Sequence, residues 1–184
     1  FLLINSPNIL GQNSIIVNNL SVDFLLSPDR VLKNGYPIDI ELENATQNPD
    51  NYQIIGIGSS NPLLGWQIFS KKEDTYQEAY RIIVSNNKEK IEKDIGDLWD
   101  SNKVESNKSI NIKYSGIELK PDLIYYWKVK VWINNDQESE FSDYQKFKTS
   151  KELKKHYTSK YHVEKKINSF NEIKKISNKK TFVD

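Results

Sequence analysis

The 184-residue sequence has no cysteine, no methionine and only two histidines. Without cysteine the chain has no disulfides, thiolate nucleophiles or cysteine-based zinc sites. His156 and His162 are too few for a histidine-rich metal site or most catalytic triads, and six-residue spacing in a lysine-rich segment indicates exposed side chains rather than ligands. No apolar run approaches the ~18 residues of a membrane span. We therefore expect no metal, no cofactor and no membrane partner.

The residues present are those of a folded domain. Apolar residues make up 37% of the chain and aromatic residues 11%, so a core can be buried. The length suits one ordinary domain plus an appendage. The net charge of +1 argues nothing about partners, because basic and acidic residues nearly balance.

Charge nevertheless divides the sequence at about residue 150. Residues 151–184 hold ten Lys and four acidic residues and no Gly or Pro. We interpret this segment as a basic linker and the start of a truncated next domain, because so short a stretch buries no core alone. Binding of a polyanion through its lysines is the alternative, but Glu152, Glu164 and Glu172 dilute the charge and favour a solvated linker without nucleic-acid binding.

Period-two alternation dominates the first 150 residues and predicts strands separated by turns. The expected strands cover residues 20–24, 38–42, 52–57, 63–69, 80–84, 110–114, 123–133 and a last run through 141–147. On 123–133 apolar residues alternate with Lys128 and Lys130, which predicts a sheet covered on one face only. This pattern indicates an all-β antiparallel sandwich.

One short helix is expected at residues 87–96. Asn87 can cap its N-terminus, Ile91 and Ile95 share a face, and Gly96 can end it. Residues 1–19 would form an N-terminal extension and residues 20–150 the sandwich.

The E–F corner of fibronectin type III domains has a pattern similar to Leu119-x-Pro121-x-x-x-Tyr125-x-x-x-Val129. The resemblance implies that the Tyr125 hydroxyl turns back onto upstream backbone and pins the crossover between two sheets. Ser139, Ser142, Phe147 and Thr149 resemble the last strand of that family. The implied fold is an immunoglobulin/fibronectin-III-like antiparallel β-sandwich with an extended C-terminal tail.

A narrower resemblance rests on an ordered series of motifs. They are Pro62-Leu-Leu-Gly-Trp66-Gln, Gln77-Glu-Ala-Tyr80-Arg-Ile82, Asp97-Leu-Trp99-Asp100-Ser101, Tyr114-x-Gly116-x-x-Leu119 and Tyr125-Tyr-Trp127-Lys-Val129-Lys-Val-Trp132. The series resembles the N-terminal fibronectin-type-III-like domain of bacterial α-L-rhamnosidases, glycoside hydrolase family 78. Residues 29–60 exceed that family's usual link between its first strands and predict an insertion or an extra hairpin.

The resemblance implies a non-catalytic accessory domain of a multidomain enzyme. Family 78 enzymes carry their catalytic carboxylates in a later (α/α)6 barrel, so no catalytic residue is expected here, although the parent would hydrolyse α-L-rhamnosides. The expected partners are the remaining domains of the parent chain, and the expected location is periplasmic or secreted.

Three residues are candidates for an interaction site. Trp132, Tyr126 and Lys130 lie on the face of strand 123–133 opposite its apolar side chains. They could contact a neighbouring domain, which we favour, or form a sugar-stacking platform of a carbohydrate-binding module.

Two other motifs favour plain structural roles. Asp94, Asp97 and Asp100 could supply a glycosidase carboxylate pair, but a solvated turn is favoured. Gly56-Ile-Gly58 lacks the third glycine and the helix of a phosphate loop, and favours a turn.

Overall fold

The computed structural model describes residues 15–154, which form two short helices and a set of mainly antiparallel strands. The strands are β1 (Ile16–Val22), β2 (Val31–Lys33), β3 (Tyr36–Ile38), β4 (Gln53–Ile54), β5 (Gly56–Ser59), β6 (Leu63–Phe69), β7 (Gln77–Ser85), β8 (Trp99–Asp100), β9 (Val104–Glu105), β10 (Ile112–Lys113), β11 (Ile124–Ile133), β12 (Gln137–Glu138) and β13 (Gln145–Lys154). The helices are α1 (Leu42–Thr46) and α2 (Lys88–Glu92). Within the described residues no helix is long and apolar enough to cross a membrane.

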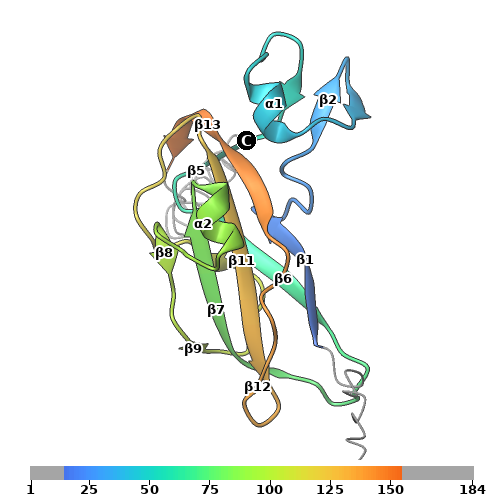
Figure 1. The fold of residues 1–184 in the computed structure, drawn as a ribbon, viewed down its shortest axis with the longest axis vertical. Coiled ribbons are helices and arrows are strands. Elements are labelled where there is room, and N and C mark those ends of the chain that lie inside the picture. Colours follow the sequence, from blue (N-terminus) through green and yellow to red (C-terminus); the bar gives the residue numbers. More distant parts are fainter. Residues whose placement is uncertain (1–14, 155–184) are drawn as a thin grey trace, which may run out of the picture. The chain divides into compact units, whose positions relative to one another are not determined.

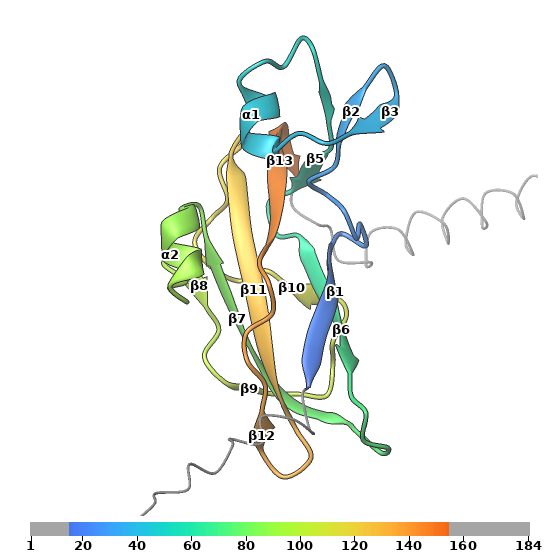
Figure 2. The ribbon, with the colours of Figure 1, turned by 45° about the vertical axis from the view of Figure 1, so that its right-hand side comes forward.

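Two sheets form the predicted sandwich (Figures 1 and 2). The smaller has the order β1-β6-β10, and the larger has the order β5-β13-β11-β7-β8, with β12 also on β11 and β9 also on β7. All pairings in the two sheets are antiparallel except β5 with β13, which is parallel.

The core lies between the two sheets because alternate residues of β7 and β11 point inward. Val129 pairs with Ile82, and Trp127 pairs with Val84 across the β7–β11 ladder, and all four are fully buried. The strands predicted at 63–69 and 123–133 are confirmed. Other buried core residues include Val22, Leu64, Trp66, Tyr114, Tyr125 and Phe147.

The predicted tyrosine corner is present. The Tyr125 hydroxyl accepts a hydrogen bond from the Lys120 backbone N–H at 2.7 Å and donates to the Lys120 carbonyl at 3.3 Å. Its ring stacks on Phe147 with the centroids 5.6 Å apart. The corner therefore fixes the crossover that leads into β11.

The prediction that the larger sheet is covered on one face only is wrong. The opposite face of β11 is also buried over most of its length. Ile91 of α2 packs there with Ile83 and Tyr126, together with Phe141 and Tyr144 from the segment before β13. Figure 1 shows α2 lying against β7 and β11.

The helix near residue 90 is shorter than predicted. The Asn87 side chain caps it by accepting a hydrogen bond from the Lys90 N–H at 3.1 Å. The helix ends at Glu92, and Asp94 takes φ +60°, so Ile95 leaves the helical face and is exposed. Gly96 is not the helix cap, because the C-cap of α2 is Lys93. Glycine fits position 96 because a Cβ there would lie 2.3 Å from the Trp99 carbonyl oxygen.

Residues 31–54 form a small separate layer. β2 pairs with β3 and β4, and the hairpin turn is Asn34-Gly35, which adopts φ values of +52° and +83°. The strand predicted at 38–42 is wrong beyond Ile38, because Leu42 begins α1 and is buried beneath it with Val31 and Ala45.

The expected turn at Gly56-Ile-Gly58 is instead an edge strand. β5 lies so close to β13 that a Cβ on Gly56 would be 3.0 Å from the Ser150 Cα.

The described sandwich extends beyond the predicted limits of 20–150. β1 begins at Ile16, and β13 continues to Lys154. The predictions for His156, His162 and the remainder of the basic segment lie outside the described residues.

Candidate functional site on the outer face of the larger sheet

The three candidate residues lie on the outer face of the larger sheet, the side turned away from the core. This outer face consists of Ala79, Arg81, Ile83 and Ser85 of β7, paired with Trp132, Lys130, Lys128 and Tyr126 of β11. The alternation of the two long strands places them there, since their neighbours along each strand point into the core.

Trp132 is almost covered by its own chain. Its exposed fraction is 8%, and the Nζ atoms of Lys103 and Lys130 lie 5.0 Å and 5.1 Å from its ring centroid. Cations at this distance are attracted to the electron-rich ring. The ring is therefore already occupied and leaves little area for a sugar or a neighbouring domain.

Tyr126 is buried at the other end of the same face. Its exposed fraction is 5%, its hydroxyl donates to Glu43 Oε1 at 2.7 Å, and its ring meets Tyr144 edge-on. Burial, together with the neighbouring Glu43 carboxylate, raises the pKa of the hydroxyl, so Tyr126 stays a neutral donor. Six residues of strand separate it from Trp132, or about 20 Å, so the two do not form one site.

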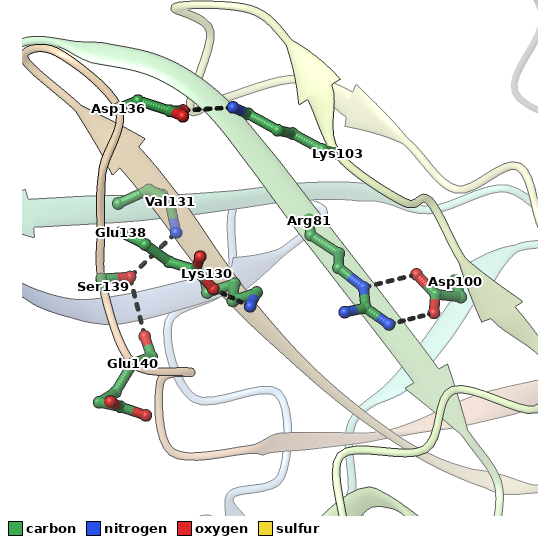
Figure 3. Close-up of polar contacts among 9 residues, drawn as sticks. All are labelled: Arg81, Asp100, Lys103, Lys130, Val131, Asp136, Glu138, Ser139 and Glu140. Carbon is green, nitrogen blue, oxygen red and sulfur yellow. Dashed lines mark hydrogen bonds and ion pairs between the residues drawn. The ribbon is translucent and has the colours of Figure 1, made fainter.

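Lys130 lines a cleft beside Phe141, and Figure 3 shows its contact with Glu138. Its ammonium forms an ion pair with Glu138 and lies 5.2 Å from the Phe141 centroid. The cleft has a volume of about 390 Å³ and includes Asp94 and Glu140. Four of the lining residues, Arg81, Asp94, Lys130 and Glu138, are thus each already part of an ion pair.

Arg81 and Asp100 make the best-defined ion pair on the outer face (Figure 3). Arg81 Nε donates to Asp100 Oδ1 at 2.9 Å, and Nη2 donates to Oδ2 at 2.6 Å. These hydrogen bonds hold the pKa of Asp100 below its usual value and raise the pKa of Arg81. The two-point contact joins β7 to β8.

Each residue of the Trp99-Asp100-Ser101 motif has a structural role. The Trp99 ring packs edge-on against Tyr114 at 5.3 Å, Asp100 binds Arg81, and Ser101 Oγ accepts the Ile82 N–H at 2.8 Å. The motif fastens the loop after α2 to the edge of β7.

Serine side chains cover the part of β11 that β13 does not pair. Ser139 Oγ accepts the Val131 N–H at 3.0 Å, and Ser142 Oγ accepts the Val129 N–H at 3.2 Å. Their own N–H groups donate back to the Val131 and Val129 carbonyls, each at 2.9 Å. This segment brings Phe141 over the outer face (Figure 3 shows the Ser139 contacts).

The three nearby aspartates do not form a catalytic pair. Asp94 pairs with Lys128, Asp97 with Lys90 at 2.7 Å, and Asp100 with Arg81. Each carboxylate therefore serves a separate cation. Among residues 15–154 no group of three His, Cys, Asp or Glu side chains is placed to hold a metal ion.

Sequence reasoning did not find Arg81 and Phe141. Arg81 contacts Asp100 only because β7 pairs with β8, and their separation of nineteen residues gives no sign of this contact in the sequence. Phe141 could have been noticed because it lies between Ser139 and Ser142, a polar spacing unsuited to a regular strand.

Comparison with known proteins agrees with this architecture. Residues 44–151 match the family of Rha78A-like N-terminal immunoglobulin domains. This chain belongs to that family. The match spans more than half of the sequence, and it includes both long strands and the tyrosine corner.

The similar proteins are α-L-rhamnosidases. One from Formosa agariphila is 41% identical over 124 residues, which are 67% of this chain and 12% of the relative. The structure of α-L-rhamnosidase from Dictyoglumus thermophilum has a TM-score of 0.59 at 31% identity, over 77% of this chain and 13% of that one. The Streptomyces avermitilis α-L-rhamnosidase complexed with L-rhamnose has a TM-score of 0.56 at 26% identity, over 74% and 11%.

The match therefore covers about an eighth of the length of these relatives. Their names describe whole enzymes, of which the matching domain is a small part. The comparisons give no support to the alternative of a carbohydrate-binding module, and Trp132 and Tyr126 lie almost covered.

Proposed function

We propose that this chain is a non-catalytic accessory domain of an α-L-rhamnosidase-like glycoside hydrolase, with a role in packing against the remaining domains. The polypeptide to which it belongs would hydrolyse terminal α-L-rhamnosides. The observation that carries the proposal is the family match over residues 44–151, combined with relatives in which the same domain fills about an eighth of the enzyme.

The chemistry of the described residues supports the non-catalytic part. Inverting glycosidases need one carboxylic acid and one carboxylate about 6.5–9.5 Å apart across a sugar. Of the carboxylates that line the outer-face cleft, Asp94 and Glu138 are instead paired with lysines. Asp100, which is bound to Arg81 of the lining, has a pKa that is lowered rather than raised. A general acid requires the opposite shift.

The experiment compares three proteins with an aryl α-L-rhamnoside. They are this 184-residue chain, the Formosa agariphila relative without its matching segment, and a chimaera that carries this chain in that place. We expect no turnover by the chain alone, and greater thermal stability and activity of the chimaera than of the shortened enzyme. Turnover by the chain alone would refute the non-catalytic role, and a chimaera no better than the shortened enzyme would refute the packing role.

A further inference from the structure

An apolar loop follows β1 and is exposed. Residues 24–26 read Phe-Leu-Leu, and we call them the apolar loop. Phe24 is 70% exposed and Leu26 is 61% exposed, with Leu25 between them also exposed. Single exposed apolar residues are common, but consecutive ones are characteristic of interaction surfaces.

The backbone of the apolar loop is held firmly. Val22 and Leu25 exchange N–H···O=C hydrogen bonds of 3.1 Å and 2.9 Å. The Asp23 N–H donates to the Leu63 carbonyl, and the Leu63 N–H donates to Asp23 Oδ1, both at 2.8 Å. The loop therefore presents its side chains from a fixed position on β6 rather than from a mobile tip.

The conformation is one that side chains rarely adopt. Asp23 and Phe24 have φ values of +47° and +68°. Asp tolerates this left-handed region, whereas a bulky aromatic residue there is an outlier. The turn gains the two hydrogen bonds between Val22 and Leu25, and it leaves the Phe24 ring in solvent, where a contact with another domain would bury it.

The outer face of the larger sheet is a poorer candidate for such a contact. Its cations Arg81, Lys128 and Lys130 are paired with carboxylates, and Trp132 and Tyr126 are covered. Docking there would break ion pairs, whereas docking on the apolar loop would bury side chains that are already free of polar partners.

We infer that the apolar loop is the surface through which this domain docks against the following domains of an α-L-rhamnosidase polypeptide. The inference rests on the proposed function and names the contact surface that it requires. In the relatives this domain is only 12–13% of the polypeptide, so the remaining domains of the same polypeptide are the partner at hand. Contacts between domains of one chain typically bury ~600–1,500 Å², to which this loop would contribute the apolar centre.

Hydroxyl-radical footprinting of the isolated chain and the chimaera described above tests the inference. We expect oxidation of Phe24 and Leu26 to fall by about threefold in the chimaera, as for side chains that pass from exposed to interface core. Protection of another surface with unchanged oxidation of the apolar loop would overturn the inference and leave the proposed function intact. Equal oxidation of every surface would overturn both.

Variants separate docking from folding. Asn is favoured in the left-handed region, so Phe24→Asn is expected to keep or raise the melting temperature of the isolated chain. The same substitution, combined with Leu26→Asn, should lower the melting temperature of the chimaera. Ile117→Asn, at another exposed apolar position, is the matched control and should leave the chimaera unchanged. An equal response of the chimaera to the control and to the loop variants would contradict docking through the loop.

Discussion

The residues of the larger sheet show that charge placed on a strand can serve cohesion rather than recognition. Arg81 and Asp100 contact each other at two points, and Tyr125 is joined twice to the backbone of Lys120. Both contacts fix the geometry of neighbouring strands. Removal of one carboxylate or one hydroxyl should therefore change the stability of the domain measurably.

Asp100→Asn should remove an acid-sensitive part of the stability. Because the pKa of Asp100 is lower in the folded chain, its contribution is present above about pH 4 and is lost as pH falls through the folded value. We expect Asp100→Asn to cost about 1 kcal/mol at neutral pH and little once the wild-type carboxylate is protonated. Urea unfolding at pH 7 and pH 3 measures this, with exposed Asp143→Asn as the control. An equal loss at both pH values would contradict the assignment.

Tyr125→Phe should weaken the corner without creating a cavity. The ring and its stacking on Phe147 remain, but the hydrogen bond from the Lys120 N–H is lost. We expect a loss of about 1 kcal/mol in the free energy of unfolding. Tyr36→Phe, on the exposed β2–β3 hairpin, provides the comparison and should change stability little. Equal effects of the two substitutions would argue against the corner.

At the scale of elements, strands with a local sequence pattern could be predicted, whereas elements that depend on distant contacts could not. β6 and β11 could be predicted because apolar side chains recur at every second position of each stretch, such as Leu64, Trp66 and Ile68 in β6. The strand expected at 38–42 could not, because Leu42 turns into a core that exists only when α1 and β4 fold onto β2. Ile95 was wrongly predicted to lie on the helix with Ile91, because their four-residue spacing does not reveal that Asp94 takes a positive φ.

Asn87→Ala should destabilise α2 and the cover that it provides. The substitution removes the acceptor for the Lys90 N–H, which typically costs about 1 kcal/mol. Amide hydrogen exchange of residues 88–92 should accelerate, while exchange in β11 stays slow. The neighbouring exposed Asn86→Ala is the matched control, and similar exchange in both variants would refute the capping role.

Two glycines allow a matched test of close packing between loops. A Cβ at Gly116 would lie 2.4 Å from the Leu98 carbonyl oxygen, whereas at Gly58 the nearest atom is 3.8 Å away. We expect Gly116→Ala to cost about 1–3 kcal/mol, since backbone must move. Gly58→Ala should be close to neutral by the same chemical denaturation. The reverse order would contradict the described loop path.

At the scale of the whole described domain, a polar latch joins the small layer of residues 31–54 to the sandwich. Lys146 Nζ lies 2.9 Å from Glu43 Oε2 and also pairs with Glu41, while Tyr126 donates to Glu43. Burial opposes ionisation of Glu43, but the hydrogen bonds from Tyr126 and Lys146 outweigh it and lower its pKa. The latch therefore favours the charged form.

Glu43→Gln should loosen that layer selectively. The stabilisation by ionised Glu43 is present above the unfolded pKa of about 4.3 and disappears as pH falls through the lower folded value. At pH 7 we expect faster hydrogen exchange in β2–β4 in the variant, with β7 unchanged. Wild type should approach the variant in acid. Glu140→Gln, at an exposed residue in the segment before β13, is the control, and uniform acceleration across the domain would contradict a local latch.

The sandwich and its core were accessible from sequence, whereas the cover of the outer face was not. Alternation in β11 and the Leu119–Val129 pattern sufficed for the fold, because both are local. The burial of Trp132 and Tyr126 depends on Lys103 and Glu43, which are distant in sequence and reach them only in the folded chain. The sequence therefore predicted correctly which face of β11 carries Trp132 and Tyr126, but not that this face is covered.

Gln145 gives the molecule a built-in optical reporter. Its side-chain amide donates to the carbonyls of Leu20 and Leu26 at 2.6 Å and 2.9 Å, while its Oε1 accepts the indole N–H of Trp127 at 3.2 Å. Through these hydrogen bonds Gln145 connects the loop after β1 to the indole of Trp127, which is fully buried. A contact that displaces this loop should therefore change the fluorescence emission of Trp127, without any label attached to the chain.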